Sequence, residues 1–181
     1  MYTFFYKFLK IFFLTLIFVY VIILVLRKGS IMEEEKLVRN LSLTKKGKYT
    51  AWTNTGMSTS KKNIFGYGET ICDASGKPTK IIRTIKTYSC YRRLARISPK
   101  SMLIRAMADE SGTTVKLFKV INIDENNHKI FLKLVAILKD KKWNDNSYVE
   151  KYKTGIYSAS KRARKYYKIR LNKQNNISKH N

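Results

Sequence analysis

The side chains in this sequence best suited to binding chemistry lie close to its C-terminus. The run from Ser160 to Lys173, SKRARKYYKIRLNK, combines seven basic residues with a pair of tyrosines. Cations displace counterions from phosphate groups, while aromatic rings stack on bases or lie among lipid headgroups. We therefore predict a polyanion-binding site formed by Lys161, Arg162, Arg164, Lys165, Tyr166, Tyr167, Lys168, Arg170 and Lys173.

The same residues have a plainer explanation. Tyr167, Ile169 and Leu171 alternate with Lys168 and Arg170, which is also the pattern of a final edge strand protected by lysines. The two explanations differ in what a truncation of the C-terminus does. The first predicts a loss of polyanion binding, and the second predicts a loss of thermal stability.

Groups for catalysis or metal binding are scarce. The only histidines are His128, in a predicted hairpin tip, and His180, beside the C-terminus, which makes a His-based metal cluster or a Ser-His-Asp triad improbable. Cys72 and Cys90 have a spacing that suits neither a zinc site nor a CxxC redox pair. We favour free thiols, with one disulfide as the alternative for an exported domain. We predict no catalytic residue, metal, cofactor or small-molecule ligand, and therefore no enzyme.

The charge of the chain points to an anionic partner. Its 37 basic and 12 acidic residues give a formal net charge of +25. Residues 1–30 contribute +4, residues 31–150 contribute +11, and residues 151–181 contribute +10 without a single acid. The positive charge is therefore densest at the C-terminal end. Nucleic acid, anionic lipid and an acidic envelope polymer are the candidate partners.

A second feature is the apolar stretch Ile11–Leu26, in which no residue is charged. With the residues just before it, the stretch makes about 28 Å of helix, close to the roughly 30 Å of a bilayer core. It predicts a retained single-pass membrane anchor that includes Phe8, Ile11, Ile17, Val21 and Leu26. A cleaved secretory signal is the alternative, but the residues after Leu26 lack the small-residue pattern of a peptidase site. The basic residues that follow favour a cytoplasmic location for the rest of the chain.

Between these two features the pattern is mostly that of β-strands. Lys48–Thr55, Ile64–Cys72 and Pro78–Tyr91 are rich in β-branched and aromatic residues and are separated by polar turns. Gly66 and Gly68 alternate on one face of the second strand. They indicate a twist, a bulge or a close aromatic neighbour, because no helix start follows them as a phosphate-binding loop requires.

One helix is predicted from Pro99 to Glu110, since Ser98 fits its N-cap and Gly112 its C-terminal cap. The clearest pair of strands follows, Thr113–Asp124 and Lys129–Asp140, joined by a short polar turn. The second strand is apolar on both faces, so we expect it at the centre of a sheet and covered by the helix. Its predicted core face comprises Ile130, Leu132, Leu134, Ala136 and Leu138.

These patterns predict an α+β fold with a single N-terminal transmembrane helix, a small and mainly antiparallel β-sheet domain with one main helix, and a basic C-terminal tail. The predicted boundaries are a membrane anchor at 1–28, a juxtamembrane linker at 29–46, a soluble domain at 47–157 and the tail at 158–181. Tyr148–Tyr157 is expected to form a last strand. The predicted function is a membrane-anchored module that binds a polyanion, and the alternative is a structural or assembly subunit of a membrane protein complex.

Overall fold

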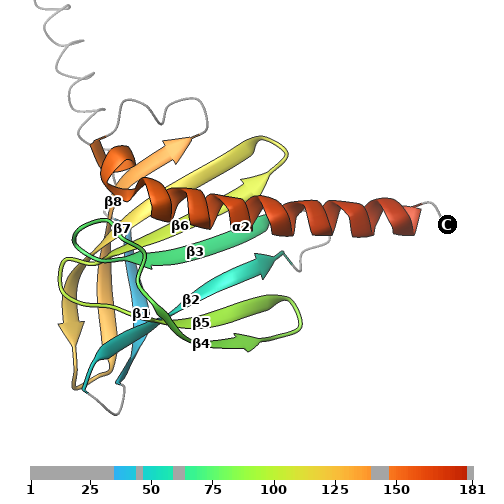
Figure 1. Cartoon of the computed structure of the whole chain (residues 1–181). Coiled ribbons are helices and arrows are strands. Elements are labelled where there is room, and N and C mark those ends of the chain that lie inside the picture. The colour runs from blue at the N-terminus through green and yellow to red at the C-terminus, as the bar shows by residue number, and fades with distance from the viewer. Residues whose placement is uncertain (1–34, 44–46, 59–63, 140–146, 179–181) are drawn as a thin grey trace, which may run out of the picture. The chain divides into compact units, whose positions relative to one another are not determined.

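The computed structural model describes residues 35–43, 47–58, 64–139 and 147–178. Within them, eight strands are followed by one long helix (Figure 1). The strands are β1 (Lys36–Leu43), β2 (Tyr49–Met57), β3 (Gly66–Cys72), β4 (Ile81–Lys86), β5 (Cys90–Arg96), β6 (Met102–Asp109), β7 (Gly112–Asp124) and β8 (Lys129–Lys139), and the helix is α2 (Ser147–Ser178).

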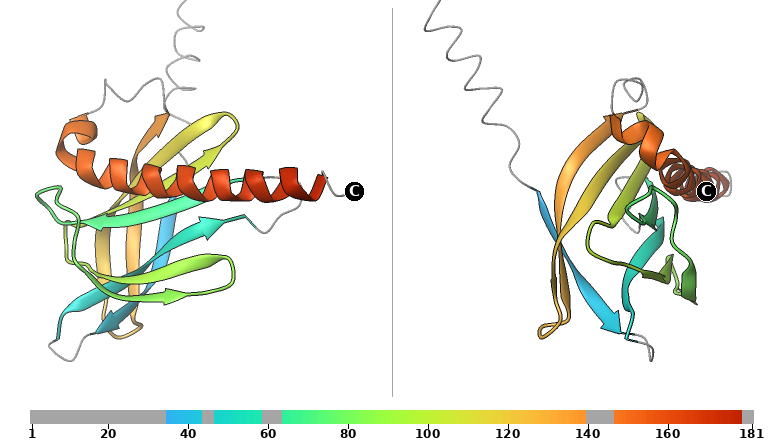
Figure 2. Two further views of the ribbon diagram at one scale, coloured as in Figure 1. Left: turned by 45° about the vertical axis from the view of Figure 1, so that its right-hand side comes forward. Right: turned by 60° about the vertical axis from the view of Figure 1, so that its left-hand side comes forward.

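Six of the strands form a closed barrel in which neighbouring strands are antiparallel. The order β1-β8-β7-β6-β3-β2 closes because β2 also pairs with β1 (Figure 2). β5 runs along β2, and β4 pairs with β5 as an outer edge. The barrel is therefore closed by a single strand, β2, which pairs with β1 near its start and with β3 near its end.

The hairpin of β7 and β8 confirms the predicted pair of strands, and a register shift divides it into two parts. Leu117 of β7 lies opposite Ala136 of β8, whereas the next residue, Phe118, lies opposite Leu134. One residue of β8 is therefore extra at this point, as in a β-bulge. An extra residue moves the following side chains to the other face of the strand.

The predicted core face of β8 is buried throughout, but it belongs to two cores. Ile130, Leu132 and Leu134 pack in the cluster inside the barrel. Ala136 and Leu138, beyond the bulge, pack in a second cluster between the sheet and α2. All five side chains are buried, so their predicted burial is confirmed. The prediction that they share one face is wrong because the bulge reverses the alternation.

α2 lies across β3 and β6 and bends at Tyr152, whose backbone angles are not helical (Figure 1). Its buried apolar side chains recur at helical spacing and are Tyr152, Ile156, Ala159 and Ala163. A Cβ at Gly66 would overlap the carbonyl of Ala163, and a Cβ at Gly68 would overlap the carbonyl of Ala159. The alternating glycines thus allow close approach of the helix backbone, where the sequence suggested a twist, a bulge or an aromatic neighbour.

The predicted helix from Pro99 to Glu110 is wrong, because this segment contains β6. Its supposed C-terminal cap, Gly112, instead begins β7 with a φ of 125°. The side chains of β6 alternate between the cores, with Met102 and Ile104 in the cluster against α2 and Leu103 in the barrel interior. β6 pairs with β3 and β7 on its two edges, and the two clusters cover its two faces, so the apolar side chains of both faces are buried.

The predicted α+β fold is therefore wrong: the chain forms a closed barrel with two additional strands and a C-terminal helix. β1 falls within residues 29–46, predicted as a linker, and pairs with β8 and β2. The predicted strand Tyr148–Tyr157 and the predicted tail 158–181 belong to α2 as far as Ser178. This also removes the explanation of the basic run as an edge strand.

The prediction of a single-pass membrane protein is also corrected. In the part of the chain that the structure describes, no helix is long and apolar enough to cross a membrane. The predicted anchor Ile11–Leu26 and its residues Phe8, Ile11, Ile17, Val21 and Leu26 lie outside that part. The structure therefore gives no support to a single-pass membrane localisation.

Candidate polyanion-binding surface

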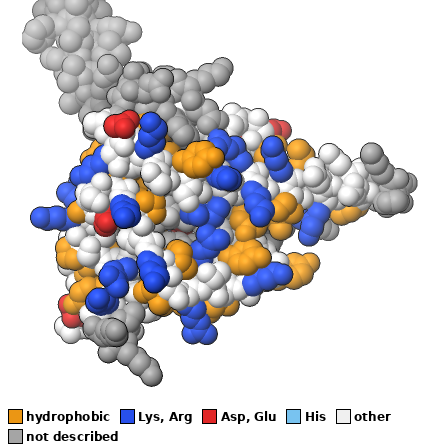
Figure 3. All heavy atoms as spheres, viewed as in Figure 1, with side chains coloured by type: hydrophobic (Ala, Val, Ile, Leu, Met, Phe, Trp, Pro, Cys, Tyr) orange, Lys and Arg blue, Asp and Glu red, His pale blue; other side chains and the backbone are white. Residues whose placement is uncertain are grey.

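The basic residues predicted to bind a polyanion lie on a helix and not on an extended tail. From Lys151 to Lys173, α2 carries nine lysines and arginines and no acid. Figure 3 shows Lys and Arg side chains along this helix and over the strands beside it, with the few acidic side chains toward the margin of the view. The fold therefore turns a basic stretch of sequence into part of a broad basic face.

The second part of this face is the hairpin of β4 and β5. From Ile81 to Arg96 this hairpin carries five basic residues and no acid. Side chains alternate along a strand, and Tyr91 and Arg93 occupy the face of β5 that is turned toward α2. The ring centroid of Tyr91 lies 6.3 Å from that of Tyr166 on the helix. This second acid-free segment is visible in the sequence, but its position beside α2 is not.

Arg162 links the helix to the sheet. Its Nη2 donates to the backbone carbonyl of Glu69 at 2.8 Å, and its Nη1 donates to Ser158 Oγ at 2.8 Å. Burial, and then the positive charge of Arg93, lower the pKa of Arg162 to about 10. Two guanidinium groups are therefore close enough to repel each other. An anion bound between them would relieve that repulsion.

An exposed tyrosine and two more cations extend the same surface. Tyr88, in the turn between β4 and β5, is fully exposed. It lines a hollow of about 290 Å³ together with Arg170 and Lys173 of α2. The Nε of Arg170 is buried and has no hydrogen-bond partner among the described residues. We call the whole surface the α2–β5 face; it comprises Tyr88, Tyr91, Arg93, Arg162, Tyr166, Arg170 and Lys173.

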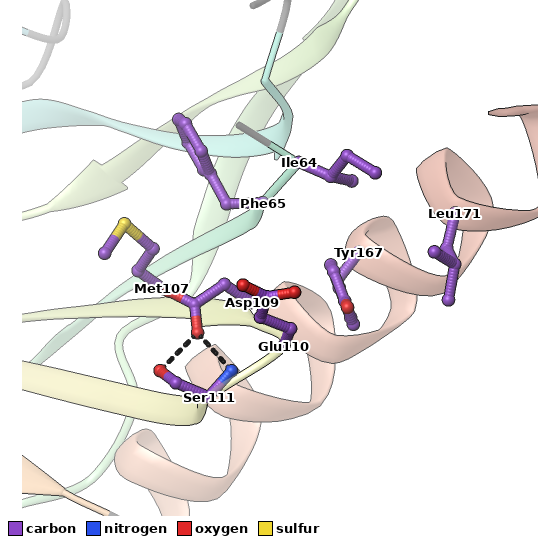
Figure 4. Close-up of a pocket in the computed structure, with 8 residues that line it drawn as sticks. All are labelled: Ile64, Phe65, Met107, Asp109, Glu110, Ser111, Tyr167 and Leu171. Carbon is purple, nitrogen blue, oxygen red and sulfur yellow. Dashed lines mark hydrogen bonds between the residues drawn. The ribbon is translucent and has the colours of Figure 1, made fainter. Parts of the chain in front are cut away.

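Tyr167, the other member of the predicted tyrosine pair, lies elsewhere. It packs against the core beneath α2 and lines a separate hollow of about 450 Å³, beside Asp109 and Glu110 (Figure 4). Asp109 is held there by Ser111, whose amide and hydroxyl donate to Oδ1 at 2.9 and 2.6 Å. Carboxylates repel a polyanion, so the structure separates Tyr167 from the predicted site.

The other predicted cations are exposed but do not belong to the α2–β5 face. Lys161, Arg164, Lys165 and Lys168 are on the solvent side of α2. The Nζ of Lys161 lies 5.9 Å from the centroid of the Tyr157 ring, within reach of a cation–π interaction. These residues add positive potential around the α2–β5 face without defining its shape.

No alternative chemistry is evident in the described part of the chain. No group of His, Cys, Asp and Glu side chains there could hold a metal ion. Cys72 and Cys90 are unpaired, and burial raises the pKa of the Cys72 thiol to about 12. Comparison of the chain with protein-family models, with curated proteins and with solved structures gave no match. Functional inference therefore depends on the chemistry of the surface.

Proposed function

We propose that the protein is a polyanion-binding module and that single-stranded nucleic acid binds along its α2–β5 face. Two pairs of side chains carry this proposal: the rings of Tyr91 and Tyr166, and the guanidinium groups of Arg93 and Arg162. Each pair joins β5 to α2, so the α2–β5 face presents both cations and rings. Cations that track phosphates and rings that stack on bases are the two components of single-strand recognition.

The tyrosines favour nucleic acid over other polyanions. Heparin-like polymers and anionic lipid headgroups offer charge but no flat heterocycle to an aromatic ring. Tyr88 is fully exposed beside Arg170 and Lys173, so its ring is accessible for stacking on a base. Unpaired bases are the ligand that would use both the ring and the two cations.

The proposal is tested by titrating a labelled oligothymidylate with the complete chain at several salt concentrations. Each phosphate contact on a single strand adds about −0.7 to the slope of log K against log salt. The double variant Arg170→Gln/Lys173→Gln should therefore flatten that slope by about 1.4. The control, Lys119→Gln/Lys129→Gln, removes the same charge from exposed positions on β7 and β8 and should leave the slope nearly unchanged.

Tyr88→Ala separates stacking from electrostatic attraction. Loss of one stacked base weakens oligothymidylate binding by about 1–3 kcal/mol, whereas binding of heparin or of anionic vesicles should not change. Equal losses for all three ligands would show that the rings do not contact bases. Equal effects of the two double variants would show that the α2–β5 face is not the binding surface.

A further inference from the structure

A second candidate site lies where β2 closes the barrel. β5 occupies one edge of β2, so β1 and β3 share the other edge, at Tyr49–Ala51 and Thr55–Met57 respectively. No described strand pairs with that edge of β2 between these two ends, around Trp52 and Asn54. The backbone amide of Asn54 instead donates to the carboxylate of Glu69 at 2.9 Å. The barrel therefore has a seam that is completed by a side chain.

The seam holds more positive than negative charge. Glu69 is fully buried and accepts from Arg39, from the Tyr67 hydroxyl and, at 3.1 Å, from Arg105 Nε. Burial, and then the Glu69 carboxylate, raise the pKa of Tyr67, so its hydroxyl keeps its proton and remains a donor. The Glu69 carboxylate is thus the shared acceptor for the guanidinium groups of Arg39 and Arg105. The Nε of Arg39 is buried without a hydrogen-bond partner in the described chain.

An open cleft of about 480 Å³ lies over this seam, a volume typical of small-ligand sites. Side chains on β2 and β5 alternate, so Trp52, Asn54 and Arg92 lie on the face opposite the one turned toward α2. Among the described residues, the lining contains two arginines, an indole, two amides and a hydroxyl, and it contains no acid. Its residues are Val38, Arg39, Asn40, Trp52, Asn54, Ile85, Thr87 and Arg92.

We propose that this seam cleft binds a nucleotide, with the base against Trp52 and the phosphate between Arg39 and Arg92. An indole presents a flat apolar surface for a heterocycle, and arginine forks match phosphate oxygens. Asn40 and Asn54 each offer both a donor and an acceptor to the edge of a base. The positive charge that the Glu69 carboxylate does not neutralise at the seam favours binding of an anion in the cleft. Either a free nucleotide or one nucleotide of a single strand supplies this chemistry.

This inference does not depend on the α2–β5 face, since the two surfaces lie on opposite sides of the β2–β5 pair. The sequence contains two tryptophans, Trp52 and Trp143. In a Trp143→Phe background the emission of Trp52 reports directly on the cleft. Stacking of a base on the indole should quench that emission in a saturable manner.

The complete chain in the Trp143→Phe background is titrated with inorganic phosphate, with AMP and with oligothymidylate. Quenching by AMP assigns a free nucleotide to the cleft, and quenching by the oligonucleotide alone assigns a nucleotide of a strand. Arg92→Gln should weaken either ligand about tenfold. Arg96→Gln, which removes an exposed arginine of the same strand outside the cleft, should not.

Two results would overturn the inference. One is the absence of Trp52 quenching by both AMP and the oligonucleotide. The other is an equal effect of Arg92→Gln and Arg96→Gln on the affinity. Arg170→Gln/Lys173→Gln leaves the cleft intact and should not change AMP quenching. If that variant also leaves the salt dependence of oligonucleotide binding unchanged, the α2–β5 face fails while the cleft stands.

Discussion

Glu69→Ala tests whether the buried seam holds the barrel closed. The substitution removes the only described side-chain carboxylate that contacts Arg39 and Arg105, and both guanidinium groups are largely shielded from water. It also leaves the amide of Asn54 and the hydroxyl of Tyr67 without the acceptor they share. The barrel would then be closed by its short strand pairings alone.

The expected loss of stability is large. Removing one partner of a buried ion pair costs about 3–5 kcal/mol, because the remaining charge is buried without compensation. The unsatisfied amide belongs to the same network and is not counted separately. For a chain of 150–250 residues, each kcal/mol lowers the melting temperature by about 2–4 °C. We therefore expect Glu69→Ala to melt roughly 6–20 °C below the parent.

Thermal unfolding of the complete chain, followed by far-UV circular dichroism, measures this shift. Glu125→Ala is the matched control, because that carboxylate is exposed and accepts from the Tyr49 hydroxyl at the surface. Its loss should cost less than about 1 kcal/mol. Arg39→Met/Glu69→Ala should recover part of the loss, since it removes one uncompensated charge. A Glu69→Ala variant that melts within about 2 °C of the parent would refute this account of the seam.

Two further predictions concern α2 and the sheet beneath it. Gly68→Ala should destabilise the fold by about 1–3 kcal/mol, read from the urea midpoint, because its Cβ would overlap the Ala159 carbonyl and α2 would have to move; an unchanged midpoint would show that the helix is not held this closely. Burial raises the pKa of Cys72 from 9 to about 12, so the unfolded chain ionises first as the pH rises. This component of stability is complete below pH 9 and is lost between pH 9 and 12, so Cys72→Ala should lose less stability than the parent over that range. In the native chain at pH 8, a thiol reagent should modify Cys90 before Cys72, and equal rates would contradict the burial of Cys72.

The sequence determined the parts of the fold that depend on neighbouring residues. β7 and β8 were predictable because both alternate and a short polar turn joins them. The burial of Leu132, Leu134 and Leu138 was likewise predictable, because a strand with apolar side chains on both faces is stable only where both faces are shielded from water. The basic, acid-free composition of the C-terminal stretch was also plain from the sequence, since charge is a property of residues and not of their arrangement.

Some local signals were present but outweighed by competing patterns. Ser147 and Glu150 have the spacing of a capping box, and Tyr152, Ile156 and Ala159 continue with helical spacing. The alternation around Tyr167 suggested a strand instead. For β6 a helix was predicted where the structure has a strand, because a few apolar residues at helical spacing also fit a strand. Pairing on both edges decided in favour of the strand, and one of the two partners, β3, lies 30 to 42 positions earlier in the sequence.

The tertiary structure alone decided how the binding residues are combined. The separation of Tyr166 from Tyr167 follows from which flank of α2 each occupies, and that depends on where the helix packs on β3. The meeting of Arg93 with Arg162, and of Arg39 with Glu69, joins segments 69 and 30 positions apart. Composition fixed the positive charge and the number of rings. Only the closing of the barrel and the packing of the helix brought them together on the α2–β5 face and in the seam cleft, because side chains distant in sequence become neighbours only through backbone pairing and core packing.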